Sequence, residues 1–310
     1  MSKLIIHAGF HKTGTSAIQR TLYNNEALLS KNNYFYPNTD PFEAHHKLLA
    51  RLLNSQVDNF EEAKNDAYRT LATFKEQASG KDVVISSEMI CEGLKPTVFE
   101  HAFEVFEQVE IHFYIRNQLE LIESAYNQQV KQNGESRSLL EYKPYTVDLY
   151  SHVEQYREAY PSIVTKCHLY DKRKFIDGNL ISDFFERVLE IKDPQINRET
   201  QGITNKSLSP VACLLLRYAN KVLETSSEAR QEYIKRLFSS FSDTSNYSYK
   251  LIPNHIEEQI LREVDFCNKR LDREYLDADY FSKISVRNIE FLSDERAFEI
   301  ARSKEFKVII

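Results

Sequence analysis

Short apolar runs alternate with longer amphipathic stretches along the first half of the chain. Four of these runs have the length of strands and span residues 3–8, 82–86, 109–115 and 163–170. The stretches between them carry apolar residues at helical spacing, as in the charged segment 59–77. Buried strands separated by helices are typical of a parallel sheet. The pattern therefore predicts an α/β fold, in which a mostly parallel, doubly wound sheet is flanked by helices.

The second half of the sequence is predicted to be mainly helical. After the capping candidate Ser207, an apolar stripe follows at helical spacing, made of Leu208, Val211, Leu215, Tyr218 and Val222. The polar stretch 239–249 predicts a mobile loop. The length of 310 residues is sufficient for one large domain, so we expect a single domain over 1–310, with an α/β core at 1–176 and a helical extension at 177–310.

Charge and composition exclude several classes of partner. The 40 Lys and Arg residues are outnumbered by 46 Asp and Glu, and the net charge is -6. Such a balance disfavours nucleic acid and anionic lipid as partners. No apolar stretch has the length of a signal-peptide core or a membrane span, so we expect a soluble, cytoplasmic protein. The four scattered cysteines favour reduced thiols over zinc or disulfide sites.

A glycine-bounded loop follows the first predicted strand. Its residues are Gly9-Phe10-His11-Lys12-Thr13-Gly14-Thr15-Ser16, and a helix is predicted directly after them. A loop between a strand and a helix directs main-chain N–H groups toward one point, where a phosphate fits. P-loop kinases have the same glycine spacing but place a lysine after the second glycine, where this chain has Thr15. The alternative is an ordinary strand-to-helix turn that contains a lysine by chance.

The position of Lys12 inside this loop resembles a known family. The string from Gly9 to Ser16 is similar to the 5′-phosphosulfate-binding loop of sulfotransferases that use 3′-phosphoadenosine-5′-phosphosulfate (PAPS), except that His11 replaces the usual proline. The resemblance implies a P-loop-like fold. It also implies a PAPS site that includes Gly9, His11, Lys12, Thr13, Gly14, Thr15 and Ser16.

A second basic residue, Arg116, directly follows the third predicted strand. Open α/β sheets bind ligands at this edge, and a guanidinium suits a phosphate dianion. The next helix is predicted to bury a stripe of Leu119, Ile122, Tyr126 and Val130, with Ser124, Asn127 and Lys131 on its other face. Arg116 followed by Ser124 resembles the 3′-phosphate motif of the same family, which implies that both bind the 3′-phosphate. Taken alone, such an arginine is more often a surface salt-bridge partner.

Sulfuryl transfer requires in-line geometry, stabilisation of the leaving phosphate oxygen and a base for the acceptor proton. Lys12 is the candidate for the stabilisation, and no metal is expected. Glu88 follows the second predicted strand at the same sheet edge, where the family supplies a histidine or a glutamate as base. A salt-bridged or helix-capping glutamate is the alternative. His46 is the rival base, whereas His45 and His7 are expected to pack in the core.

The resemblance implies a sulfotransferase that transfers the sulfuryl group of PAPS to a hydroxyl or an amine and releases adenosine 3′,5′-bisphosphate. A glycan or glycolipid is the acceptor that the family favours. Lys206 lies in a segment that the resemblance equates with a basic loop closing over the 3′-phosphate. Two alternatives remain open: a P-loop kinase, in which Asp171 binds magnesium, and a nucleotide-binding protein without catalytic activity.

Overall fold

In a computed structural model of the protein, the residues that the structure describes are 2–37, 59–91, 95–142, 148–192, 196–197 and 207–309. Its contacts divide the chain into two compact units. The first comprises Met1–Arg116, Asp148–Ile203 and Cys267–Asp279, and the second comprises Asn117–Val147, Thr204–Phe266 and Tyr280–Ile310. Each unit combines separated pieces of chain. The single domain with a division at residue 176 stays a prediction.

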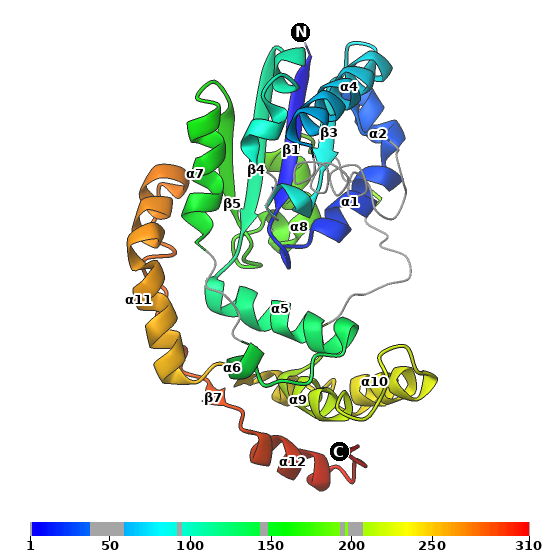
Figure 1. Ribbon diagram of the computed structural model, residues 1–310, viewed down its shortest axis with the longest axis vertical. Coiled ribbons are helices and arrows are strands. Elements are labelled where there is room, and N and C mark those ends of the chain that lie inside the picture. Colours follow the sequence, from blue (N-terminus) through cyan, green and yellow to red (C-terminus); the bar gives the residue numbers. More distant parts are fainter. Residues whose placement is uncertain are drawn as a thin grey trace. The chain divides into compact units, whose positions relative to one another are not determined.

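The first unit contains a five-stranded, all-parallel sheet (Figure 1). In spatial order its strands are β2 (Tyr34–Phe35), β3 (Asp82–Ser86), β1 (Lys3–Gly9), β4 (Gln108–Ile115) and β5 (Val164–Leu169). The predicted α/β fold with its parallel sheet is therefore confirmed, and four strands lie where the apolar runs placed them. The edge strand β2 was not predicted, because two residues are too few to show an alternating pattern.

Helices flank this sheet. In the first unit they are α1 (Thr15–Asn24), α2 (Glu26–Lys31), α4 (Phe60–Ala78), α7 (Leu149–Ala159) and α8 (Leu180–Arg187). Short helical turns are η1 (Glu88–Ile90), η2 (Pro96–Phe99), η3 (Phe103–Val105), η4 (Ile176–Gly178) and η6 (Asp272–Leu276). Ile18 and Leu22 of α1 share a buried cluster with Phe184 of α8 and Ile5 of β1. Burying these side chains holds α1, and the loop before it, against the central strand.

The second unit is largely helical, as the sequence predicted. It contains α5 (Gln118–Asn133), α6 (Leu139–Tyr142), α9 (Pro210–Ala219), α10 (Glu228–Ser240), η5 (Thr244–Tyr247), most of α11 (Asn254–Leu271) and α12 (Asp294–Ser303). A two-residue pair joins β6 (Tyr249–Lys250) to β7 (Glu290–Phe291). The buried stripe predicted for α5 is confirmed, with Leu119, Tyr126 and Val130 fully buried. Asn127 was wrongly placed on the other face, because it is buried and donates to the Leu208 carbonyl.

Two local predictions in the second unit are wrong. The N-cap of α9 is Ser209, whose hydroxyl accepts a hydrogen bond from the Ala212 N–H, and not Ser207. Pro210 causes this shift, because proline suits the first helical position and keeps the residue before it extended. The stretch 239–249 is not an irregular loop, since it contains the end of α10, all of η5 and the start of β6. Asn246 of η5 is buried there.

Candidate functional site

The predicted phosphate loop emerges from the centre of the sheet. β1 is the central strand and lies between β3 and β4, so the loop after Gly9 leaves the sheet between these two parallel strands. This is the edge at which open parallel sheets bind ligands. The same edge also receives Glu88 after β3 and Arg116 after β4. The predicted site residues that follow β1, β3 and β4 therefore lie at one edge of the sheet.

The loop has an alternating backbone conformation. Lys12 has φ of 66° and Gly14 has φ of 80°, and Thr13 between them is not among the residues with positive φ. Such alternation of hand directs successive main-chain N–H groups toward the same side, where an anion is favoured. The Thr13 hydroxyl donates to the Phe10 carbonyl over 2.6 Å and closes the turn from inside. The loop is thus fixed by its own side chain.

Both loop glycines are closely packed against side chains. A Cβ atom on Gly9 would lie 2.2 Å from the Thr15 hydroxyl oxygen, and one on Gly14 would lie 2.2 Å from Cδ2 of Leu180. Gly14 is also the N-cap of α1 and has the left-handed conformation that glycine adopts without strain. Packing accounts for these two glycines, so only other features of the loop can indicate a bound anion.

Thr15 provides such a feature. Its side chain is only 1% exposed, and its Oγ1 has no hydrogen-bond partner among the residues that the structure describes. A buried hydroxyl without a partner costs free energy of about 1–3 kcal/mol. The first turn of α1 contains no acidic residue, so the positive end of the helix dipole is not neutralised from within the helix. An oxyanion at this helix end would be stabilised by the dipole and by a hydrogen bond from the Thr15 hydroxyl.

Arg116 contacts the loop directly. Its Nη1 donates to the main-chain carbonyl of Lys12 over 3.2 Å, and its guanidinium lies 5.4 Å from the centre of the Tyr170 ring. The arginine is therefore not simply a surface salt-bridge partner, because it ties the end of β4 to the loop after β1. Its positive charge adds to that of the helix end. Lys12 and His11 are both half-buried in the loop, whereas Ser16 is exposed.

The remaining candidates lie in different places. Glu88 is half-buried and begins η1, which contacts β1; the preceding Ser87 N–H donates to the His7 carbonyl over 3.0 Å. Ser124 lies half-buried on α5 in the second unit. His45, His46 and Lys206 fall outside the described residues.

A buried polar group beneath the loop was only partly foreseen. His7 is fully buried, as predicted, and its Nδ1 lies 2.8 Å from the Ser86 hydroxyl. Burial, reinforced by His112, lowers the pKa of His7 to about 3, so its ring is neutral at physiological pH. Gln19 of α1 donates to the Ser86 carbonyl over 3.2 Å. The burial of Gln19 could have been predicted from the sequence, because this polar residue lies beside Ile18 and Leu22 on the predicted buried face of the helix.

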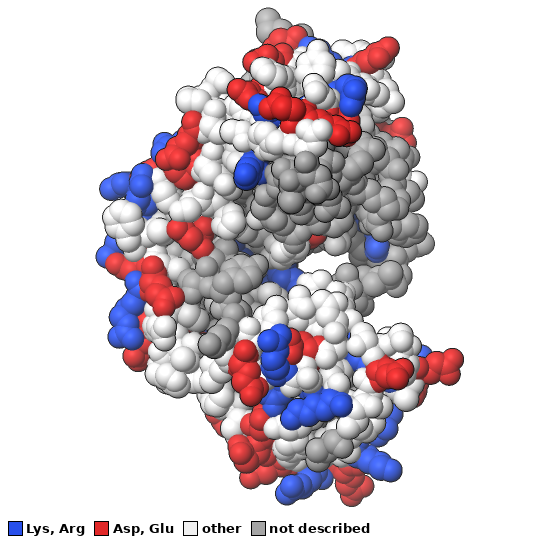
Figure 2. All heavy atoms as spheres, viewed as in Figure 1, with Lys and Arg blue, Asp and Glu red and all other residues white. Residues whose placement is uncertain are grey.

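Asp171, the predicted magnesium ligand of a kinase, forms an ion pair with Arg173. Its carboxylate accepts from Nε of Arg173 over 3.0 Å and from Nη2 over 2.6 Å. Within the described ranges, no group of three or more His, Cys, Asp and Glu residues has an arrangement that could hold a metal ion. On the face drawn in Figure 2, basic and acidic side chains are interspersed. No described helix is long and apolar enough to cross a membrane.

Comparison with known proteins gives one relative. A curated protein of Archaeoglobus fulgidus, described as an "Uncharacterized protein", is 31% identical over 180 residues. The alignment covers 57% of this chain and 49% of the archaeal protein, so the chain spans about half the length of that relative. No family model matches the sequence, and no solved structure matches it.

Proposed function

We propose that this protein is a PAPS-dependent sulfotransferase with a doubly wound, P-loop-like core. The observation that carries the proposal is the loop between β1 and α1. It combines a buried Thr15 hydroxyl without a described partner, an acid-free helix N-terminus and the contact between Arg116 and Lys12. These features favour a ligand with an anionic group at the end of α1. The sequence from Gly9 to Ser16 makes the phosphosulfate of PAPS the best candidate.

The loop would bind the donor and leave the reacting sulfur accessible. The N-terminal amides of α1 and the hydroxyls of Thr15 and Ser16 would hold the 5′-phosphate. Lys12 would stabilise the charge that develops on the oxygen bridging phosphorus and sulfur as the S–O bond breaks. Such a contact is stronger in the transition state than in the ground state, so it accelerates the reaction. A lysine can provide this neutralisation without a metal ion.

Glu88 is the proposed base. As the acceptor oxygen or nitrogen forms its bond to sulfur, its proton would pass to the Glu88 carboxylate. The bond from sulfur to the bridging oxygen would break in line, and adenosine 3′,5′-bisphosphate would leave with both electrons. Atoms and charges balance without a further reactant. His46 remains the rival for this role.

The 3′-phosphate is assigned to Arg116 and Ser124, with Lys206 as the residue that covers it. Guanidinium groups bind phosphate dianions through parallel N–H donors. A glycan or glycolipid is proposed as the acceptor, and the cytoplasm as the location of the protein.

Calorimetric titration with adenosine 3′,5′-bisphosphate, ADP and ATP with magnesium tests the donor class. We expect the bisphosphate to bind in the presence of a metal chelator, and at least about 10-fold more tightly than ADP, because only the bisphosphate carries the 3′-phosphate. Preference for ATP with magnesium would replace the proposal with a kinase. Tight binding of the bisphosphate without PAPS turnover on any acceptor would instead indicate a nucleotide-binding protein.

A further inference from the structure

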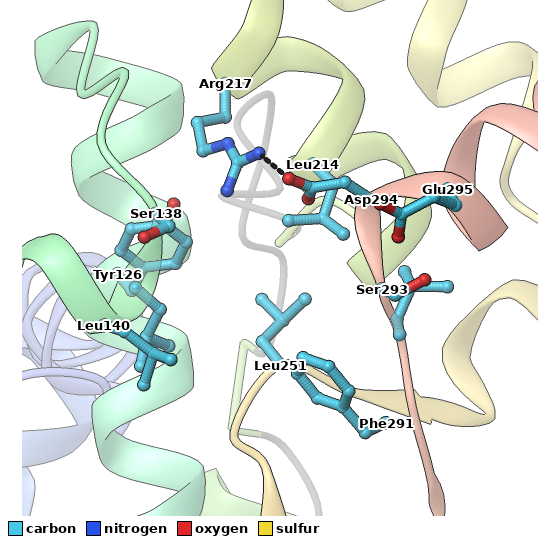
Figure 3. A pocket seen from close by; sticks show the side chains of 12 residues that line it. Tyr126, Ser138, Leu140, Leu214, Arg217, Leu251, Phe291, Ser293, Asp294 and Glu295 are labelled. Carbon is cyan, nitrogen blue, oxygen red and sulfur yellow. Dashed lines mark hydrogen bonds and ion pairs between the residues drawn. The ribbon is translucent and has the colours of Figure 1, made fainter.

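The second unit contains a pocket that the proposed function does not use. Its volume is about 180 Å³, and residues of α5, α6 and α9 line it together with the segment that runs from β7 into α12 (Figure 3). All of the lining residues belong to this one unit. Pockets of small-molecule sites are mostly apolar, with a few polar groups that fix the orientation of the ligand. This pocket has that composition.

Its walls are formed mainly by apolar side chains, among them Leu139, Leu214, Leu251 and Leu292. All four belong to the buried core of the unit. Two further apolar residues that line the pocket are partly open to solvent, since Leu140 is 44% exposed and Phe291 is 41% exposed. A molecule in the pocket would cover both and remove apolar surface from water.

Arg217 is the polar group at one end of this space (Figure 3). Its side chain is 5% exposed, and one Nη donates to the Asp294 carboxylate over 2.7 Å. Tyr218 donates to the same carboxylate oxygen over 2.6 Å. The Nε–H of Arg217 has no hydrogen-bond partner in the described part of the chain. The Nε atom is closed to solvent, so a ligand would reach Arg217 through the Nη edge of the guanidinium, which faces this space (Figure 3).

Charge and volume limit what the ligand can be. The Asp294 carboxylate already neutralises Arg217, and Glu295 adds a second negative charge beside it. An anion would be repelled by these two carboxylates, and a cation would face the buried guanidinium. A neutral molecule avoids both penalties. Cavities of about 150 Å³ accept a molecule the size of benzene, so the volume matches a single six-membered ring with a small substituent.

We propose that this pocket binds a neutral, ring-sized molecule whose carbonyl or amide oxygen accepts a hydrogen bond from Arg217. The ring lies among the leucines and against Phe291, and the oxygen lies at the guanidinium. All residues of the pocket belong to the second unit, and the inference does not depend on the proposed sulfotransferase activity.

The absence of tryptophan from the sequence allows a direct test in the full-length protein. The substitution Phe291→Trp places a single fluorophore in the lining of the pocket. Phe266→Trp is the matched control, because Phe266 is 70% exposed and does not line the pocket. Both variants are titrated with benzamide, benzoate and benzylamine, which share a ring and differ in charge. We expect a saturable response to benzamide in Phe291→Trp alone, with a Kd of about 1 mM as is usual for so small a ligand.

Binding of benzoate and benzylamine should be at least about 10-fold weaker, since each bears a charge that the pocket disfavours. Arg217→Met in the Phe291→Trp background should reduce benzamide affinity by a further factor of about 10 through loss of the donor. If that variant does not fold, the comparison of benzamide, benzoate and benzylamine still tests the preference for a neutral ligand. Equal responses of the two tryptophan variants, or the absence of any response, would overturn the site. Benzoate or benzylamine binding as tightly as benzamide would overturn its neutral specificity.

Discussion

Arg116 donates a hydrogen bond from Nη1 to the main-chain carbonyl of Lys12 across 3.2 Å, and thereby joins residues that are 104 positions apart in the sequence. The contact connects the end of β4 to the loop after β1. Lys12 has a positive φ of 66°, which a non-glycine residue adopts only when its surroundings hold it there. Arg116 is one of the groups that do so. The arginine therefore has both a structural and a proposed ligand-binding role, and the two can be separated by substitution.

Replacing Lys12 tests its proposed catalytic role. Lys12→Asn is preferable to Lys12→Ala, because asparagine tolerates the positive φ at this position. We expect PAPS turnover to fall by about 10²- to 10³-fold, while the Kd for adenosine 3′,5′-bisphosphate rises by less than about 10-fold. Turnover is measured as release of the bisphosphate with 4-nitrophenol and a set of glycans as acceptors. Equal losses in turnover and in product binding would contradict stabilisation of the transition state.

Replacing Arg116 tests the assignment of the 3′-phosphate. Arg116→Ala should weaken binding of adenosine 3′,5′-bisphosphate by about 10- to 100-fold and should change ADP binding much less, since only the first ligand bears a 3′-phosphate. Calorimetry of both ligands with the variant and the natural protein measures the difference. Arg116→Lys keeps the charge and is the control. If the alanine variant weakens both ligands equally, Arg116 acts only by holding the loop at Lys12.

Gly14 should be sensitive to the smallest substitution. Its φ is 80°, and an added Cβ would lie 2.2 Å from Leu180, so Gly14→Ala combines backbone strain with overpacking. We expect a loss of about 2–4 kcal/mol in the free energy of unfolding, measured in urea. In Gly14→Ala/Leu180→Ala the steric part should disappear, and the double-mutant cycle should give a coupling of about 1–2 kcal/mol. Additive losses would show that Leu180 is not the obstacle.

A buried ionic network joins distant segments of the second unit. Lys250 and Glu257 are fully buried and form an ion pair of 2.8 Å, and Lys250 also donates to the Arg287 carbonyl. Arg287 binds both Glu257 and Glu123, and Glu123 accepts the N–H groups of Leu251 and Ile252. The Glu123 carboxylate of α5 thereby fixes the chain directly after β6.

Removing one charge from this network should be costly. Lys250→Met leaves Glu257 buried with one cationic partner fewer, and we expect a loss of about 3–5 kcal/mol in the free energy of unfolding. Lys250→Met/Glu257→Gln removes the unbalanced charge and should recover part of this loss. Denaturant unfolding of both variants checks the prediction, and a double variant no more stable than Lys250→Met would refute it.

The buried His7 should make the protein sensitive to acid. Burial lowers its pKa to about 3 from an ordinary value of 6.5, so the unfolded chain takes up the proton first as the pH falls. The stability that depends on neutral His7 is complete above pH 6.5 and declines below it. His112 acts in the same direction, because burial lowers its pKa as well. From pH 7 to pH 5 we expect His7 to remove about 2 kcal/mol of stability.

His7→Asn tests this dependence, because asparagine retains a polar atom toward Ser86 and does not titrate. The variant should be less stable at pH 7, and its free energy of unfolding should decrease about 2 kcal/mol less between pH 7 and pH 5. Urea unfolding across this range measures both quantities. Parallel pH profiles for the variant and the natural protein would show that another group governs the acid sensitivity.

The sequence predicted four strands of the sheet and missed the edge strand β2. The strands at 82–86 and 109–115 are rich in apolar residues, because they are buried on both faces, and such runs are visible without a structure. β2 consists of Tyr34 and Phe35 alone and exists because it pairs with β3. Pairing with a distant strand has no local signature. The same reason explains Asn127, whose burial depends on Leu208 far along the chain.

The candidate site was predictable where its residues are contiguous. The loop from Gly9 to Ser16 and the strand end at Arg116 could be identified from order and spacing, because parallel strands place their carboxyl ends at one edge. The unpartnered hydroxyl of Thr15, the approach of Leu180 to Gly14 and the ring of Tyr170 beside Arg116 could not. Each of these depends on which segments from other parts of the chain pack against the loop.

By itself, the sequence determined the succession of strands and helices and the loop that follows β1, because hydrophobic periodicity and glycine spacing are local properties of a chain. Only the tertiary structure decided that β1 is the central strand, that Arg116 holds Lys12, and that Arg217 is buried beside Asp294 at an apolar pocket. These relationships arise from contacts between residues far apart in the chain. Their free energies depend on packing and desolvation, which no short stretch of sequence specifies.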